Sequence, residues 1–212
     1  MTGSFQVLCQ NPGVTGFTVH SGKIAVYPEN NVDTDRIIPA RFLSRVSRSG
    51  YGELLFSDVR GGDFPLDRPE AQGASVLVVG TNFGCGSSRE HAVWSIQQAG
   101  FRAVVALKTD SSPGYSDIFR QNSANCGLLL IELPQNDHQI LVGAGSGAEV
   151  SINLSAQTVT LGQEVFSFDI APATKNALIQ GLDLIGTTLQ YEAAIAKHEA
   201  ESAVYSPERA SR

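Results

Sequence analysis

The segment Asn82-Phe-Gly-Cys-Gly-Ser-Ser-Arg-Glu-His91 gathers side chains that could bind and transform a small acid. Its two glycines let the backbone turn sharply, and Ser87 and Glu90 have the spacing of a capping box, which predicts that a helix begins there. The free N–H groups of that helix would then face a ligand, and Arg89 adds a guanidinium fork suited to a carboxylate. The segment therefore indicates a site for a carboxylate-bearing molecule, although a glycine-rich loop before a serine cap is equally common in a plain helix start.

Other chemistries fit this segment less well. A phosphate-binding P-loop needs a lysine, a dinucleotide fingerprint needs a third glycine where Arg89 stands, and the hydrolase motif G-x-S-x-G is absent. Cys85 near a helix N-terminus could be a nucleophile of lowered pKa, which we rank below the carboxylate site. His91 lacks a visible acid to orient it toward Ser87, so a structural hydrogen bond is the better interpretation. Cys126 lies beside an apolar run and is expected in the core.

Composition excludes several other functions. The formal net charge is -6, which disfavours broad binding to nucleic acids or anionic membranes. No apolar run approaches the ~20 residues of a membrane span. The three cysteines, Cys9, Cys85 and Cys126, are widely spaced and form no C-x-x-C pair, so neither a zinc site nor a self-contained iron–sulfur site is expected. No signal peptide is visible at Met1–Gln10, and we expect a reduced cytoplasmic protein.

The elements that must position the segment form a strand–helix–strand unit. Residues 75–80 are a continuous apolar run bounded by glycine, which predicts a buried strand immediately before the motif. Residues 87–99 show helical spacing of apolar side chains, and residues 102–107 predict a second strand. A third buried strand is expected at 127–133.

The rest of the chain predicts smaller elements. Residues 17–26 indicate a strand pair turning at Ser21-Gly22, and residues 149–170 alternate as a small antiparallel meander. Helices are expected as follows: a short one from Pro39, one around 117–123, and two near 174–181 and 187–200. No break separates a second domain, so we expect one domain over 1–212, with a loose lead-in at 1–16 and a disordered tail at 201–212.

Two motifs in order carry a resemblance to a known family. The 82–92 segment resembles the signature of the swivelling domain of the aconitase superfamily. Asn31-Val-Asp-Thr-Asp-Arg-Ile-Ile-Pro39 resembles the upstream motif of the small subunits of 3-isopropylmalate dehydratase. Further agreement comes from Asp117-Ile-Phe119 with Asn122, from Gly127-Leu-Leu129, and from Gly181-Leu-Asp-Leu-Ile-Gly186. The resemblance covers roughly residues 16–200.

The resemblance implies an α/β swivelling domain, a small mixed sheet or barrel flanked by helices. It implies a hydro-lyase of leucine biosynthesis that interconverts 2-isopropylmalate and 3-isopropylmalate by removing and re-adding water. It also implies a large-subunit partner that holds a 4Fe-4S cluster, with no cofactor on this chain and no activity without the partner. Related acids remain alternatives, namely methylmalate or citraconate, dimethylmalate and homoaconitate, as does a non-catalytic anion-binding module.

The resemblance also implies residue roles. Ser87 matches the base that takes a proton from carbon, Ser88 a supporting hydroxyl, and Arg89 a clamp on the substrate carboxylate. Gly86 would line the substrate, together with an upstream arginine that is Arg45 by spacing, with Arg41 and Arg48 as rivals. The remaining motif residues are expected to shape the loops, the helix cap and the subunit contact: Asp33, Thr34, Asp35, Cys85, Glu90 and His91.

Two departures from the family pattern stand out. Cys85 occupies a position where many aconitases carry glutamate, which fits the isopropylmalate branch. The 108–115 loop is longer than the family leads us to expect, which bears on the subunit interface or the substrate gate.

Overall fold

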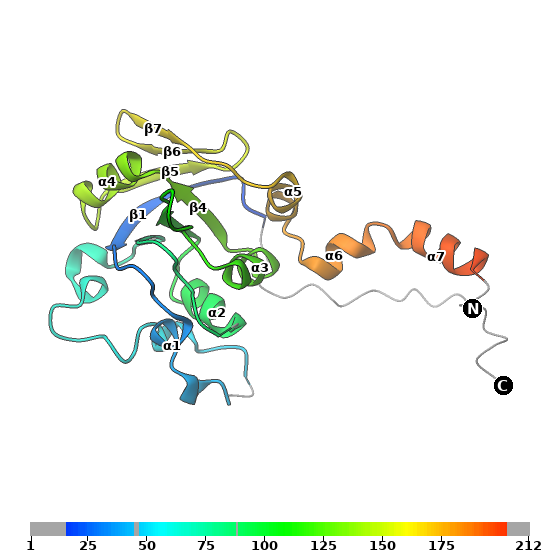
Figure 1. The fold of residues 1–212 in the computed structure, drawn as a ribbon, viewed down its shortest axis with the longest axis horizontal. Helices are drawn as coiled ribbons and strands as arrows, with labels where there is room; N and C mark the ends of the chain where they lie inside the picture. Colours follow the sequence, from blue (N-terminus) through cyan, green and yellow to red (C-terminus); the bar gives the residue numbers. More distant parts are fainter. Residues whose placement is uncertain (1–15, 45–46, 88, 203–212) are drawn as a thin grey trace.

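A seven-stranded mixed sheet in the order β4-β3-β2-β1-β5-β6-β7 organises the fold (Figure 1). The computed structural model describes residues 16–44, 47–87 and 89–202, apart from the Leu184 side chain. β1 lies at the junction of two halves, since it runs parallel to β2 and antiparallel to β5. The strands are β1 (Val19–Tyr27), β2 (Val76–Val79), β3 (Ala103–Leu107), β4 (Leu129–Leu133), β5 (Glu149–Asn153), β6 (Thr158–Leu161) and β7 (Glu164–Ser167).

Helices flank the sheet, and the last two extend away from it (Figure 1). The α-helices are α1 (Thr34–Ile37), α2 (Glu90–Gln98), α3 (Asp117–Cys126), α4 (Gln135–Ala144), α5 (Pro172–Gln180), α6 (Leu184–Leu189) and α7 (Glu192–Glu201). Short 3-10 helices are η1 (Ala40–Phe42), η2 (Gly52–Leu54), η3 (Pro65–Asp67) and η4 (Pro69–Ala71). Within the described part of the chain, no helix has the length and apolarity needed to cross a membrane.

In the parallel half, β2 and β3 are buried on both faces, which explains their uninterrupted apolar runs. In β2, Leu77 and Val79 pack into one hydrophobic cluster, which also contains side chains of α2 and α3. Val76 and Val78 point the other way, into a second cluster with β5, β6 and β7. The sheet therefore separates two hydrophobic cores. The motif at residues 82–91 follows the end of β2, which contributes side chains to both cores.

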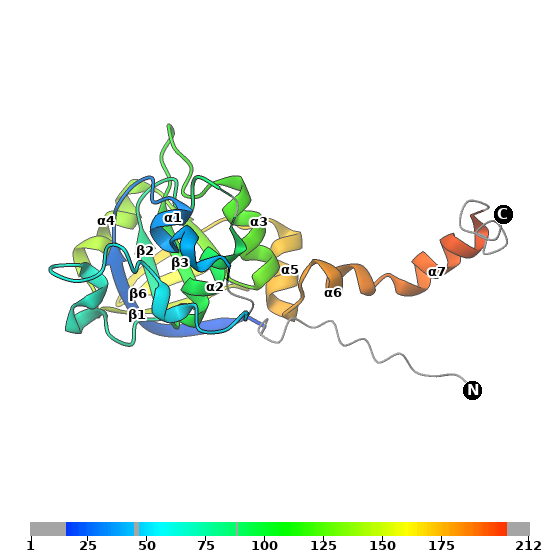
Figure 2. The same ribbon diagram turned by 90° about the horizontal axis from the view of Figure 1, so that it is seen from below.

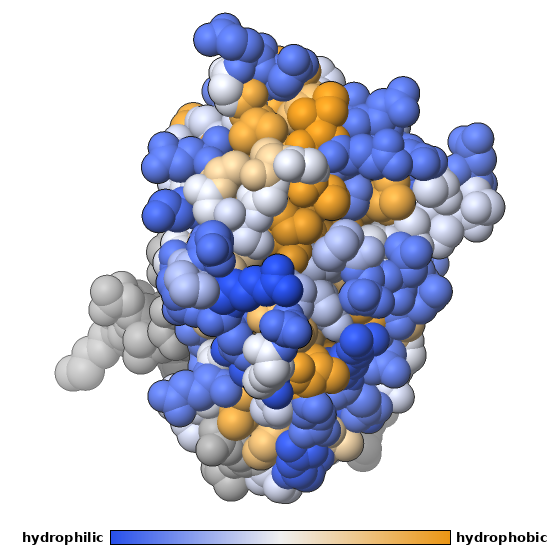
Figure 3. All heavy atoms as spheres, turned by 90° about the vertical axis from the view of Figure 1, so that its left-hand side faces the viewer, coloured by the Kyte–Doolittle hydropathy of each residue, from blue (hydrophilic) through white to orange (hydrophobic). Residues whose placement is uncertain are grey.

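Apolar side chains are only partly buried on the face of the molecule that carries α4 (Figure 3). Apolar surface lies among hydrophilic groups there. Ile140 of α4 and Val165 of β7 are among the large apolar side chains that remain exposed. From below, a narrow loop between β3 and α3 projects from the body (Figure 2).

The predicted strand pair at 17–26 is wrong, because these residues form a single strand. Ser21 and Gly22 stay in register with Ser151 and Val150 of β5 instead of turning. A Cβ on Gly22 would lie 2.0 Å from the Ser75 Oγ, so this glycine serves close packing.

The other elements agree with the sequence to varying degrees. The strand–helix–strand unit, the third strand, the meander and the helix around 117–123 are confirmed, and the helix from Pro39 is the 3-10 turn η1. The helix expected at 187–200 is divided into α6 and α7, and α4 had no predicted counterpart. The expected lead-in and tail fall almost entirely outside the described residues.

His138 in α4 makes stability depend on pH. Its side chain is 3% exposed, and its Nε2 lies 2.7 Å from the Val79 carbonyl, to which the neutral ring donates. Burial lowers the pKa of His138 below 6.5, so the unfolded chain binds more protons than the folded one under mildly acidic conditions. We expect the free energy of unfolding to fall as pH drops through about 6.5 and to level off below the folded-state pKa.

Urea unfolding between pH 7.5 and 5 measures this slope. His138→Gln removes one titrating group, so its curve should be flatter than that of the wild type. An equally steep curve for the variant would contradict the assignment to His138.

Candidate functional site

The two sequence motifs, far apart in the chain, lie side by side in the structure. The Gly84 N–H donates to the Val32 carbonyl over 2.8 Å, and the Thr34 N–H donates to the Cys85 carbonyl over 2.9 Å. An isolated parallel bridge joins Asp33 to Cys85. Backbone pairing, rather than side-chain contact alone, therefore sets the position of one motif against the other.

Both glycines of the downstream motif adopt left-handed backbone conformations. Gly84 has φ +73° and Gly86 has φ +88°. A Cβ on Gly84 would lie 2.3 Å from the Cγ of Phe119, whereas one on Gly86 would lie 3.4 Å from the Asp33 Cβ and 3.8 Å from the Thr34 Oγ1. Gly84 is thus required by packing as well as conformation, and Gly86 by conformation.

Ser87 lies exposed at the end of this loop, and the upstream motif holds its backbone. The Thr34 hydroxyl donates to the Ser87 carbonyl over 2.8 Å. Thr34 is 2% exposed, so its hydroxyl is fixed by its surroundings. Thr34 therefore holds the backbone carbonyl of Ser87 in place.

The predicted capping box at Ser87 is wrong. α2 begins at Glu90, its N-cap is Arg89, and no side chain caps it. The left-handed Gly86 and the bond from Thr34 keep Ser87 in the loop, outside the first helical turn.

The Glu90 carboxylate does not cap the helix, because it accepts hydrogen bonds from two side chains instead. Its Oε1 accepts from the Trp94 Nε1 over 3.3 Å and from the Cys126 Sγ over 3.2 Å. Cys126 is buried as expected, and burial together with Glu90 raises its pKa to about 12. This thiol is therefore a structural, unreactive group.

Arg89 forms an ion pair with Asp35 across the two motifs. The Arg89 side chain is 16% exposed and that of Asp35 is 53% exposed. Because a guanidinium carries five N–H donors, the pair fixes its orientation and leaves donors for a second carboxylate.

Cys85 and His91 do not have the environment of a nucleophile and its base. Burial raises the pKa of the half-buried Cys85 thiol, and the Asp33 charge raises it further. Burial lowers the pKa of His91, whose ring packs against Tyr51 and Trp94 with centroids 5.4 and 4.6 Å apart.

The upstream arginines differ in what they contact. Arg41 pairs with Asp58 and holds the pKa of that carboxyl below its usual value. The Arg48 guanidinium lies 5.1 Å from the centre of the Trp94 ring of α2. Arg45, and with it Ser88 of the downstream motif, lies outside the described residues.

Sequence reasoning gave no individual role to four residues that build the site. Asn31 and Asn82 both have positive φ, and the Asn82 amide donates to the Asn31 Oδ1 over 2.8 Å. Their tolerance of the left-handed region was the available signal. From the 108–115 loop, the Pro113 and Gly114 carbonyls accept from the N–H groups of Asn82 and Phe83 over 2.8 and 2.9 Å.

The site combines an exposed hydroxyl, an oriented guanidinium and a helix start, which suits proton transfer on a bound carboxylic acid. In the described ranges, no group of three or more histidine, cysteine, aspartate or glutamate side chains could hold a metal ion.

Several known proteins resemble this chain over most of its length. The profile of the aconitase C-terminal domain family matches residues 14–136, and a second profile, LeuD_N, matches residues 141–172. The 3-isopropylmalate dehydratase small subunit of Corynebacterium jeikeium is 43% identical over 195 residues, covering 90% of this chain and 96% of that protein. The small subunit of the same name from Geobacillus sp. WCH70 is 42% identical over 197 residues, covering 86% and 95%.

A solved structure shares the fold. The crystal structure of 3-isopropylmalate dehydratase from Methanocaldococcus jannaschii aligns with a TM-score of 0.62 and 25% sequence identity. It covers 85% of this chain and 99% of that one. The mixed sheet and its flanking helices are therefore the expected swivelling-domain fold.

Proposed function

We propose that Ser87 and Arg89 perform this chain's part of the hydro-lyase reaction. The proposal follows from the family, because the chain belongs to the aconitase C-terminal domain family and is a small subunit of 3-isopropylmalate dehydratase. The reaction interconverts 2-isopropylmalate and 3-isopropylmalate in leucine biosynthesis. The observation that supports these roles is the backbone pairing of the two motifs, which brings Ser87 and Arg89 against Thr34 and Asp35.

Ser87 is the base in this proposal. Its alkoxide removes a proton from the carbon beside a carboxylate, and the electron pair of that C–H bond forms the double bond. The neighbouring carbon releases its hydroxyl, which takes a proton from an acid on the large subunit's side of the site and leaves as water. Water then adds back with the opposite orientation. A serine alkoxide is costly at neutral pH, and the start of α2 at Glu90 and the charge of Arg89 are the features that stabilise it.

Arg89 binds a substrate carboxylate in this proposal. Asp35 holds one side of the guanidinium, and the remaining N–H donors face a second anion. A lysine at this position would keep the charge and lose the fork, so it would not replace Arg89.

The rest of the active site is assigned to a large subunit. The name of the relatives, small subunit, implies such a partner. A 4Fe-4S cluster on that partner would act as a Lewis acid on the substrate hydroxyl and carboxylate. We place the complex in the cytoplasm.

Reconstitution tests the proposed function. The purified chain alone should give no turnover of 2-isopropylmalate, and addition of a large subunit carrying its iron–sulfur cluster should restore interconversion. Full activity of the chain alone would show that the reaction needs no large subunit, which would overturn the proposal. Binding of isopropylmalate by the complex without turnover would instead favour the anion-binding module.

A related acid is the second candidate, because the 108–115 loop departs from the family pattern, and the loop between Arg41 and Tyr51 would face the part of the substrate that differs among these acids. One or two methylenes are worth only about 1–3 kcal/mol each in such a pocket. Values of kcat/KM on methylmalate, dimethylmalate and homoaconitate, compared with that on isopropylmalate, decide the substrate.

Thr34 should matter for turnover more than for binding. Thr34→Val keeps the shape and removes the bond to the Ser87 carbonyl, so we expect kcat to fall about 10- to 100-fold while KM changes little. Thr34→Ser should retain most of kcat. Thr187→Val removes a similar hydroxyl-to-carbonyl bond in α6 and serves as the control. Equal losses in the two valine variants would contradict a positioning role for Thr34.

A further inference from the structure

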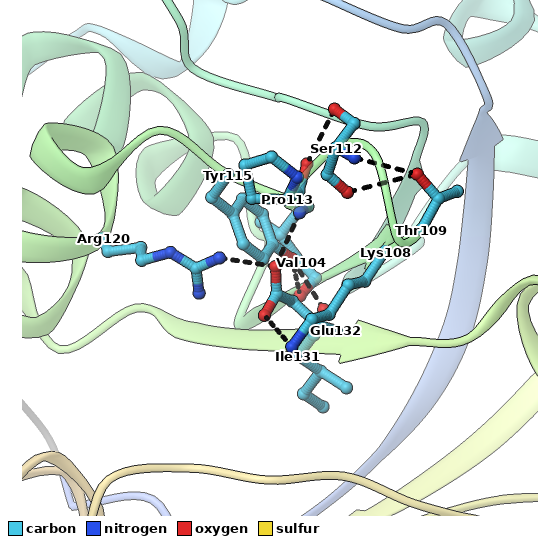
Figure 4. A network of polar contacts seen from close by, with 10 residues as sticks. Val104, Lys108, Thr109, Ser112, Pro113, Tyr115, Arg120, Ile131 and Glu132 are labelled. Atoms are coloured by element: carbon cyan, nitrogen blue, oxygen red, sulfur yellow. Dashed lines mark hydrogen bonds and ion pairs between the residues drawn. The ribbon is translucent and has the colours of Figure 1, made fainter.

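Glu132 of β4 lies under the loop that joins β3 to α3, and its carboxylate collects donors from that loop and from α3 (Figure 4). Its Oε1 accepts from the Gly114 N–H over 2.6 Å and from the Arg120 Nη2 over 2.5 Å. The Lys108 Nζ lies 4.0 Å from the other oxygen. The Glu132 side chain is only 17% exposed and Gly114 is buried, so the bond between them is shielded from water, whereas Arg120 and Lys108 are more exposed.

The group that Glu132 holds is the peptide at Gly114. A Cβ on Gly114 would lie 2.8 Å from the Glu132 Oε1, so the carboxylate and the backbone are in close contact. The Gly114 carbonyl in turn accepts from the Phe83 N–H over 2.9 Å. Pro113 makes the equivalent bond to Asn82 over 2.8 Å. A short path of hydrogen bonds thus runs from Glu132 to the loop that ends at Ser87.

Neighbouring contacts stiffen the same segment. The Thr109 N–H donates to the Ser112 carbonyl over 2.9 Å, and the Ser112 N–H donates to the Thr109 hydroxyl over 3.0 Å. The Tyr115 hydroxyl lies 2.7 Å from the Val104 carbonyl and 2.9 Å from that of Ile131. The loop is therefore closed at its tip and tied to the sheet at its end.

Two explanations of Glu132 can be separated. In the first, it only neutralises Arg120 and Lys108, which are 37% and 62% exposed, and such solvent-exposed ion pairs contribute little. In the second, its bond to the buried Gly114 N–H matters most, because a buried donor without its acceptor would move toward another partner.

We propose that Glu132 is a positioning residue, which acts through Gly114 to hold the Asn82–Ser87 loop in the geometry that turnover needs. It touches no substrate. The proposal rests on the proposed function of Ser87, and it identifies the 108–115 loop as a support of the site.

Three variants in the complex with the large subunit test the kinetic part. Glu132→Leu removes the acceptor, and kcat should fall about tenfold or more with little change in KM. Glu132→Gln keeps an acceptor oxygen and should stay within a few-fold of the wild type. Arg120→Met removes the ion pair and keeps the Gly114 bond, so it should also stay near the wild type. Equal losses in Arg120→Met and Glu132→Leu would overturn the proposal.

Hydrogen exchange on the free chain tests the structural part without any activity. In Glu132→Leu the amides of Asn82 and Phe83 should exchange at least tenfold faster, while those of β5 and β6 keep their rates. Unchanged exchange at Asn82 and Phe83, or faster exchange throughout the sheet, would overturn the positioning role. If Ser87→Ala keeps full turnover while exchange loosens in Glu132→Leu, the proposed base is wrong and the support of the loop by Glu132 stands.

Discussion

Ser87→Ala should lower kcat of the complex with the large subunit by about 10²- to 10⁴-fold, the range that a positioned general base contributes. Ser87 is exposed, and its contact with Thr34 is made through its backbone carbonyl, so loss of the hydroxyl should leave folding intact. KM and assembly with the large subunit should change little, since the Arg89 guanidinium remains in place.

Steady-state kinetics and a thermal melt check this together. Ser155→Ala, an exposed serine in the turn after β5, is the matched control and should match the wild type. Turnover of Ser87→Ala at the rate of that control would show that another group removes the proton.

Gly84→Ala should destabilise the chain by about 2–5 kcal/mol. A left-handed conformation costs an alanine about 1–2 kcal/mol. The new methyl would also collide with Phe119, whose Cγ and Cβ lie 2.3 and 2.7 Å away, and overpacking of this kind costs about 1–3 kcal/mol. Phe119 cannot move aside easily, because it is 1% exposed and packs against the rings of Phe83 and Tyr115.

Gly143→Ala is the matched control for this prediction. Gly143 lies in α4 with open space around it, so alanine there should be neutral or stabilising by about 0.5–1 kcal/mol. Urea unfolding of both variants measures the difference. A loss below 1 kcal/mol for Gly84→Ala would show that the loop adapts to a side chain.

Runs of like residues made the parallel half of the fold predictable. The apolar segments at 75–80 and 102–107 contain β2 and β3, which are buried on both faces, and Gly80 and Pro134 directly follow the ends of β2 and β4. The sequence misled at Ser21-Gly22, where a dipeptide typical of turns continues through β1. What decides that position is the close approach of Ser75, a residue more than fifty positions away.

The site was predictable in its residue types and not in its contacts. Ser87 and Arg89 stand out by composition, whereas the bond from Thr34 and the ion pair with Asp35 depend on how two loops dock. The capping box shows the limit of local patterns: the spacing of Ser87 and Glu90 is right, but Gly86 turns the backbone away before the helix starts. Glu132 carried no signal at all, because its importance comes from a peptide in another loop.

The double pairing of β1 has a consequence for synthesis on the ribosome. Its second half, from Ile24 to Tyr27, can pair with β2 while the chain is still short. Its first half must wait for β5, since Ser21 and Ser151 are 130 positions apart. Until then the segment from Val19 to Lys23 is an open strand edge, which favours pairing with other chains. Nascent or truncated chains that end before residue 149 should therefore aggregate through this edge.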